Sequence, residues 1–262
     1  MGLGLLSFVL GGAGCARPSK PPLATPIQVI EQSLRAPKAG DSVTLEESGL
    51  ERMVTIESFV LGKTSAVAWR LTDPKKDHKE VKSGSWKDVT LNTAHAFYLP
   101  AIMESPTRPV NESSILWLPR EEYRELVNTL GTTIDIRVLQ GTTWEDVLKA
   151  KSFASAKRGF DALKRLAREQ DDARKDLVFA RKEANTVDYT LLVNGTQKTV
   201  KAFRLRNWYG TYDILENENM PLVLAFTLDP QVDKTRLDVS KGDGAALAQF
   251  MNYRVKELKM QE

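Results

Sequence analysis

The sequence predicts an α+β fold dominated by β structure, with a mostly antiparallel sheet or open barrel and two inserted helical segments. Three features lead to this prediction. Apolar runs separated by turn residues fill the stretch from Ser42 to Met103 and again the last third of the chain, which is typical of strands. Between these regions apolar residues recur three or four positions apart, the spacing of a helix buried on one face. The pair Asn194-Gly195 is the one preferred in two-residue hairpins.

The first β-rich stretch begins with two neighbouring runs, Met53–Leu61 and Ser65–Leu71, joined by a short turn that contains glycine. Both are rich in β-branched and apolar residues, so we expect a hairpin. In the second run large apolar residues alternate with smaller or polar ones, which predicts a sheet with one face exposed to water. After a polar loop, two further strands are expected over Trp86–Leu91 and His95–Met103.

The middle of the chain predicts the two helical segments. A strand over Ser113–Leu118 leads into a helix that begins at Pro119, since proline suits a first helical turn, and ends at Gly131. A strand over Thr132–Leu139 follows, and the second helical segment ends near Arg174. Its predicted buried stripe consists of Phe153, Ala156, Phe160, Leu163 and Ala167.

The last third predicts a β meander. Val187–Val193 and Lys198–Arg206 flank the hairpin turn, and Thr211–Glu216 follows. Pro221–Leu228 is continuously apolar, which favours a central strand covered on both faces. A short helix over Ala245–Phe250 and a strand over Asn252–Leu258 are expected to end the fold.

The N-terminus carries an export-type signal. Residues 2–13 are apolar and uncharged, and this run is shorter than the about 20 residues that a membrane-spanning helix needs. It ends in Gly12-Ala13-Gly14-Cys15, which resembles the lipobox of bacterial lipoproteins, an aliphatic residue and two small residues before a cysteine. Gly12 stands where that family has leucine or valine. No lysine or arginine precedes the run, which indicates a signal peptide clipped at its start.

The resemblance implies that a signal peptidase removes residues 1–14 and that Cys15 becomes an acylated N-terminus. Because Ala16 follows the cysteine, it also implies the outer membrane if the host is Gram-negative. Prolines recur through residues 18–26 and favour an extended spacer of about 3.1 Å per residue. We therefore expect a lipidated tether over residues 15–26 and a single globular domain over residues 27–262, at the cell envelope.

Charge and composition argue against a nucleic-acid partner. The net charge of +3 comes from 37 basic and 34 acidic residues that are mixed along the chain. Even the densest basic stretch, Lys157 to Lys182, is interleaved with carboxylates and is typical of a solvated helix face. The chain has 1 cysteine, so no intramolecular disulfide is expected.

Catalytic and metal-binding motifs are not found. Gly62-Lys63-Thr64 resembles the end of a phosphate-binding loop, but Glu57 stands where that loop needs its first glycine. The 2 histidines, His78 and His95, do not form metal-ligand spacing with the single cysteine, and no serine lies in a nucleophile-elbow motif. The sequence therefore predicts no catalytic residue, no metal and no cofactor. Paired carboxylates remain open as hydrolytic groups, because acidic residues are numerous.

The candidate binding residues are Trp208 and Tyr209, which could form a platform for a sugar or peptide beside Arg204 and Arg206. Aromatic residues at strand starts more often pack in the core. The sequence favours a lipid-anchored envelope protein of non-enzymatic binding or assembly type, in contact with the membrane and with an envelope protein or peptidoglycan. The alternatives are a periplasmic hydrolase that uses carboxylates and a carrier of an apolar ligand.

Overall fold

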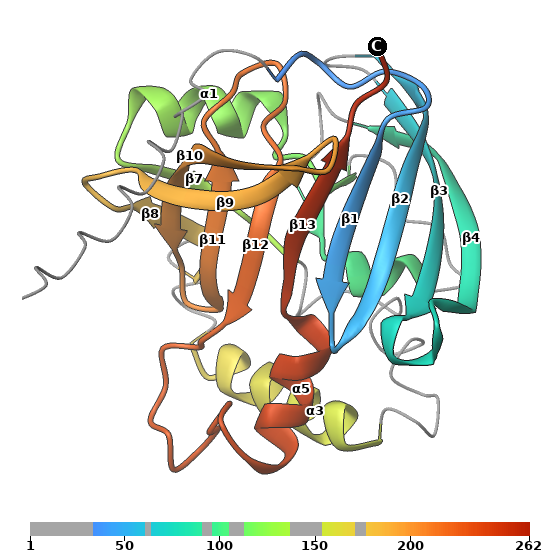
Figure 1. Cartoon of the computed structure of the whole chain (residues 1–262). Coiled ribbons are helices and arrows are strands. Elements are labelled where there is room, and N and C mark those ends of the chain that lie inside the picture. The colour runs from blue at the N-terminus through green and yellow to red at the C-terminus, as the bar shows by residue number, and fades with distance from the viewer. Residues whose placement is uncertain (1–33, 61–63, 91–95, 105–112, 137–153, 171–176) are drawn as a thin grey trace, which may run out of the picture.

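The computed structural model describes residues 34–60, 64–90, 96–104, 113–136, 154–170 and 177–262. Within these residues the chain forms one long, strongly curved sheet with helices packed outside it (Figure 1). The predicted class, β-dominated α+β with a mostly antiparallel sheet, is confirmed. No helix in this part of the chain is long and apolar enough to cross a membrane.

The first half of the sheet is a meander whose register follows the hydrophobic alternation. Val54 and Ile56 of one strand and Val67 and Trp69 of the next all point inward and are almost fully buried. Its strands are β1 (Ser42–Glu47), β2 (Leu50–Phe59), β3 (Thr64–Asp73) and β4 (Lys79–Thr90). The second of the two later strands predicted for this region is short, because Pro100 begins a 3₁₀ turn: β5 (Ala96–Tyr98) pairs in parallel with β6 (Ser113–Ile115) in a separate sheet.

The second half of the sheet closes into a small barrel. β9 pairs antiparallel with β10 and parallel with β13, so five strands form a closed mixed barrel. The turn between β9 and β10 is Asn194-Gly195, both with positive φ, as the predicted hairpin requires. The strands are β9 (Val187–Val193), β10 (Thr196–Arg206), β11 (Gly210–Leu215), β12 (Val223–Leu228) and β13 (Tyr253–Lys259).

β13 joins the two halves, because it pairs with β1 on one side and with the barrel on the other. Beyond β10 the sheet ends in β8 (Phe179–Lys182) and β7 (Gly131–Thr133). β7 is shorter than the strand predicted from residue 132, whose last residues lie outside the described part of the chain. β12 lies between β11 and β13, so the predicted central position is confirmed; the predicted cover on both faces is not, because Ala225 is half-buried and Thr227 is exposed.

Three helices are described: α1 (Arg120–Asn128), α3 (Ala154–Arg168) and α5 (Gly242–Met251). The helix predicted after Pro119 is present, but Pro119 is its N-cap instead of a residue of its first turn, and α1 ends at Asn128, three residues before the predicted Gly131. In α3 the predicted stripe is confirmed for Ala156, Phe160, Leu163 and Ala167, which are buried, whereas Phe153 lies outside the described residues. α3 and α5 lie against each other at one end of the sheet (Figure 1).

The contact between α3 and α5 depends on a glycine. A Cβ atom at Gly159 would lie 2.3 Å from the carbonyl oxygen of Asp243 and 2.9 Å from Cβ of Leu247, so a larger residue has no room. On the exposed side of the same contact, Arg158 donates to both carboxylate oxygens of Asp243, each at 2.9 Å. The contact between α3 and α5 is therefore close-packed at Gly159 and held by an ion pair between Arg158 and Asp243 on its exposed side.

Candidate functional site

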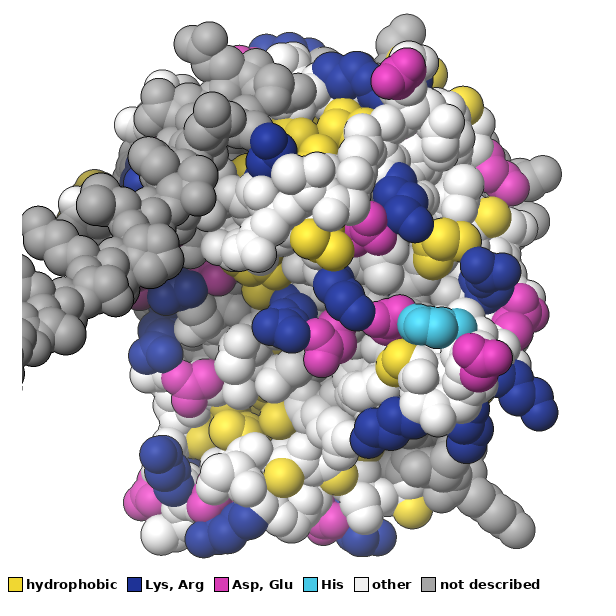
Figure 2. Space-filling model, viewed as in Figure 1, with side chains coloured by type: hydrophobic (Ala, Val, Ile, Leu, Met, Phe, Trp, Pro, Cys, Tyr) yellow, Lys and Arg dark blue, Asp and Glu magenta, His cyan; other side chains and the backbone are white. Residues whose placement is uncertain are grey.

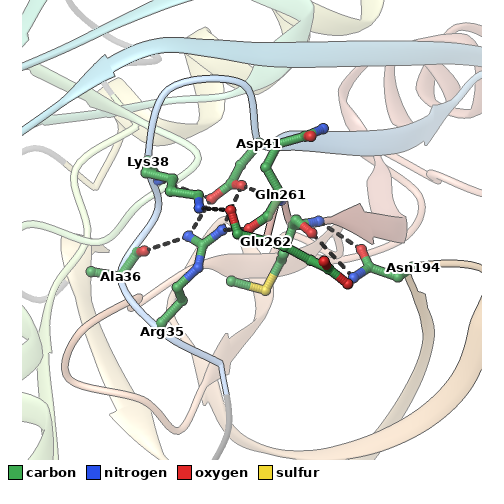
Figure 3. Close-up of polar contacts among 8 residues, drawn as sticks. Arg35, Ala36, Lys38, Asp41, Asn194, Gln261 and Glu262 are labelled. Atoms are coloured by element: carbon green, nitrogen blue, oxygen red, sulfur yellow. Dashed lines mark hydrogen bonds and ion pairs between the residues drawn. The ribbon is translucent and has the colours of Figure 1, made fainter.

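The residues that the sequence singled out for lipidation lie outside the described part of the chain. This holds for Cys15 and for the whole proline-rich spacer. Leu34 is the first described residue of the chain, and β1 begins at Ser42. The contacts around this point define what we call the entry junction: Leu34, Arg35, Lys38, Asp41, Asn194, Met260, Gln261 and Glu262 (Figure 3).

A bidentate ion pair is the centre of the entry junction. Arg35 Nη1 donates to Asp41 Oδ2 at 2.6 Å, and Arg35 Nη2 donates to Asp41 Oδ1 at 2.8 Å. The same guanidinium reaches the C-terminal segment, where Nη2 donates to the carbonyl oxygen of Gln261 at 2.5 Å. The Arg35 side chain thus joins the segment that precedes β1 to the segment that follows β13.

Asp41 is buried, and both oxygens of its carboxylate accept hydrogen bonds. Besides Arg35, it accepts the backbone N–H groups of Lys38 at 2.9 Å and Gln261 at 2.8 Å. Burial alone would raise the pKa of this carboxyl, but the hydrogen bonds from Arg35, Lys38 and Gln261 outweigh it and hold the pKa below its usual value. Asp41 is therefore a charged acceptor at neutral pH.

The β9–β10 turn completes the entry junction. The side chain of Asn194 pairs with the backbone of Met260 in both directions, donating to its carbonyl at 3.1 Å and accepting its N–H at 2.7 Å. Asn217 donates to the carbonyl oxygen of Leu34 at 2.7 Å, and Lys38 donates to the backbone oxygen of Glu262. The C-terminus lies at this end of the sheet, and helices α3 and α5 lie at the other (Figure 1).

Two cavities flank these elements. The first, of 480 Å³, opens beside the entry junction and has apolar walls from Leu34, Val193, Val200 and Met260. The second, of 440 Å³, lies between α1, β10 and the turn after β11. We call the second one the α1 pocket: Tyr123, Arg124, Val127, Asn128, Phe203, Glu216 and Glu218.

The outer face of the sheet around β13, β1 and β2 is polar. Figure 2 shows basic and acidic side chains interspersed over this face. Glu51 is paired with Lys256, and its other oxygen lies 3.3 Å from Nδ1 of His78. Mixed charge of this kind fits a solvated surface better than a track for a polyanion. His95 lies outside the described residues.

The candidate binding pair Trp208-Tyr209 lies in the turn between β10 and β11. Tyr209 is 2% exposed and packs in the core, whereas Trp208 is partly buried; the two rings meet edge to face at 5.1 Å. Asn207 fixes this turn, because its Oδ1 accepts the N–H groups of Tyr209 at 3.0 Å and Gly210 at 3.2 Å. Of the pair, only Trp208 has ring surface left for a ligand.

Comparison with known proteins gives no relative. No protein-family model, curated protein or solved structure matches the chain. Among the described residues no group of histidine, cysteine and carboxylate side chains is arranged to hold a metal ion. The function is therefore argued from the residues themselves.

Sequence reasoning missed both the entry junction and the α1 pocket. Arg35 and Asp41 are ordinary charged residues in sequence, and their partners near the C-terminus are more than two hundred positions away. The α1 pocket likewise draws on a helix, a strand and a turn that are distant along the chain.

Proposed function

We propose that the protein is a bacterial envelope lipoprotein whose domain is a non-enzymatic binding or assembly module. The observation that carries this proposal is the run Gly12-Ala13-Gly14-Cys15 at the end of an apolar, uncharged segment. Transfer of a diacylglyceryl group to the Cys15 thiol, followed by cleavage before it, leaves a lipid-bearing N-terminus. Lipid attachment then holds the folded part at the membrane surface.

The spacer gives the anchored domain its reach. A proline-rich chain is semi-rigid and extended, and residues 16–26 would span on the order of 30 Å. That length keeps the domain clear of lipid headgroups while confining it to a thin layer above them. Confinement raises the effective concentration of any partner held at the same membrane.

The entry junction holds the segment before β1 in place. Arg35 and Asp41 tie this segment to the C-terminal segment through hydrogen bonds that are part-buried or exposed.

A binding role is favoured over catalysis by the residue types of the chain. It has 2 histidines and 1 cysteine, and the cysteine is assigned to the lipid. The proposal therefore places the function in surfaces and pockets of the domain rather than in a nucleophile or a general base.

The proposal is tested by metabolic labelling in a bacterium with a clickable fatty acid, followed by membrane fractionation. We expect the wild-type chain to carry label and to sediment with membranes, and Cys15→Ser to lose both. Ser19→Ala, a substitution in the same segment that keeps the thiol, should behave as wild type. Label retained by Cys15→Ser would refute the anchor.

A further inference from the structure

The α1 pocket has an aromatic floor. Tyr123 on α1 and Phe203 on β10 lie with their ring centroids 6.3 Å apart, tilted by 56°. Tyr123 is almost fully buried, and Phe203 is partly buried. Aromatic rings in such a floor attract cations through their quadrupoles as well as apolar stems through burial.

One wall of the α1 pocket is acidic. Glu216 and Glu218 are exposed, and both belong to the turn region after β11. Burial raises the pKa of the Tyr123 hydroxyl, and the negative charges of Glu216 and Glu218 raise it further. Glu218 lies 3.9 Å from Arg120 and from Arg124, at the outer limit of an ion pair. Among the described residues Glu216 has no ion-pair partner.

The helix end adds negative potential to the same place. Val127 and Asn128 belong to the last turn of α1, where the aligned carbonyl groups give the helix dipole its negative end. Lys182 Nζ donates to the carbonyl oxygen of Leu126 at 2.8 Å and lies 5.2 Å from the Phe203 centroid. The chain therefore supplies its own ammonium group beside this ring, and the two carboxylates of the acidic wall are the groups left for a cation from outside.

Val127 lines the α1 pocket, and Leu130 follows it three positions later along the chain. Val127 is 48% exposed and Leu130, just after the helix, is 82% exposed. Covering these two side chains with apolar groups of a partner would remove their apolar surface from water. The combination calls for an occupant with one cationic group and apolar neighbours.

We propose that the α1 pocket receives a lysine or arginine side chain of a partner protein, whose adjacent apolar residues cover Val127 and Leu130. The location of the partner in the cell envelope rests on the proposed function. The chemistry of the α1 pocket is argued independently of it. The cationic head lies between Glu216 and Glu218, and its aliphatic stem lies along Tyr123 and Phe203.

The test uses the full chain, whether or not Cys15 carries lipid, in detergent micelles, with ¹³C-labelled valine and leucine methyl groups. The probes are acetyl-Leu-Arg-Leu-amide and acetyl-Leu-citrulline-Leu-amide, which match in shape and differ in charge. We expect the arginine peptide to shift the methyl signals of Val127 and Leu130 and to bind about three- to fivefold more tightly than the citrulline peptide, the size of a partly exposed charge contact.

Matched variants locate the effect. Glu216→Gln should lower the affinity for the arginine peptide to that for the citrulline peptide. Glu57→Gln, which neutralises another exposed carboxylate on β2, should leave both affinities unchanged. Equal binding of the two peptides, no shift with either, or an unchanged affinity in Glu216→Gln would overturn the inference. Since these readouts do not depend on where the protein resides, failure of the lipid anchor in the labelling experiment would be a separate result.

Discussion

The guanidinium carbon of Arg52 lies 4.7 Å from the ring centroid of Trp69, and both side chains are removed from solvent. On its other side the guanidinium donates to both carboxylate oxygens of Glu47, at 2.8 and 3.0 Å. A fully buried arginine is costly unless it is paired, so this arrangement is the most demanding electrostatic feature of the β1–β2–β3 meander. We therefore expect substitutions around Arg52 to change the free energy of unfolding strongly.

Removing the partner of Arg52 should leave an uncompensated buried charge. We expect Glu47→Ala to lower the free energy of unfolding by about 3 kcal/mol. The neighbouring Glu46 pairs with Arg254 on the exposed face, so Glu46→Ala should cost less than about 1 kcal/mol. Urea unfolding of the purified chain measures both. Equal losses for the two variants would show that the buried pair contributes no more than a surface one.

Gly84 on β4 leaves room for the Trp69 ring. A Cβ atom at this position would lie 2.9 Å from Cζ2 of the indole. We expect Gly84→Ala to push the ring off Arg52 and to cost about 1–3 kcal/mol by overpacking, although alanine is otherwise the better strand residue. Ser85→Ala, at the next position of β4, is the control and should be near neutral. A Gly84→Ala chain as stable as wild type would mean that the indole can shift freely.

The entry junction should give a pH-dependent stability. The pKa of Asp41 is lowered in the folded chain, so its contribution is present above the unfolded value of about 4 and is lost as the pH falls through the lower folded value. At pH 7 we expect Asp41→Asn to cost about 1–2 kcal/mol. The gap to wild type should close below about pH 4. Asp188→Asn, at an exposed pair with Lys201, should show no comparable effect. A gap that stays constant with pH would exclude the carboxylate as its source.

The helix pair α3–α5 should not tolerate a side chain at Gly159. In an open helix Gly→Ala is stabilising by about 1 kcal/mol. Here the added carbon meets the Asp243 carbonyl, and we expect a loss of about 1–3 kcal/mol in unfolding experiments. The exposed Arg165→Ala on the same helix adds no volume and should change stability little. A gain of stability in Gly159→Ala would mean that α5 moves away at little cost.

Local features were predictable because their physics is local. The Asn194-Gly195 hairpin depends on two residues that accept positive φ, and the α3 stripe depends on helical spacing; both are confirmed. The sequence predicted an antiparallel sheet or an open barrel, but not a closed one. Closure depends on the pairing of β9 with β13, and these two strands are separated by many residues in the sequence. Burial of Arg52 was missed for a related reason: its carboxylate and its indole come from different strands.

The candidate sites divide in the same way. The lipobox-like run around Cys15 is a contiguous signal and can be stated from sequence alone. The α1 pocket and the entry junction exist only when distant segments meet, so composition and spacing gave no warning of them. Tyr209 illustrates the limit of a local pattern, because an aromatic pair in sequence separates into one core ring and one partly exposed ring.

The most direct test of the account is the intact mass of the mature chain isolated from bacterial membranes. The account predicts a polypeptide that begins at Cys15 and carries the added mass of a diacylglyceryl group. A soluble chain that keeps residues 1–14 and an unmodified Cys15 thiol would contradict it.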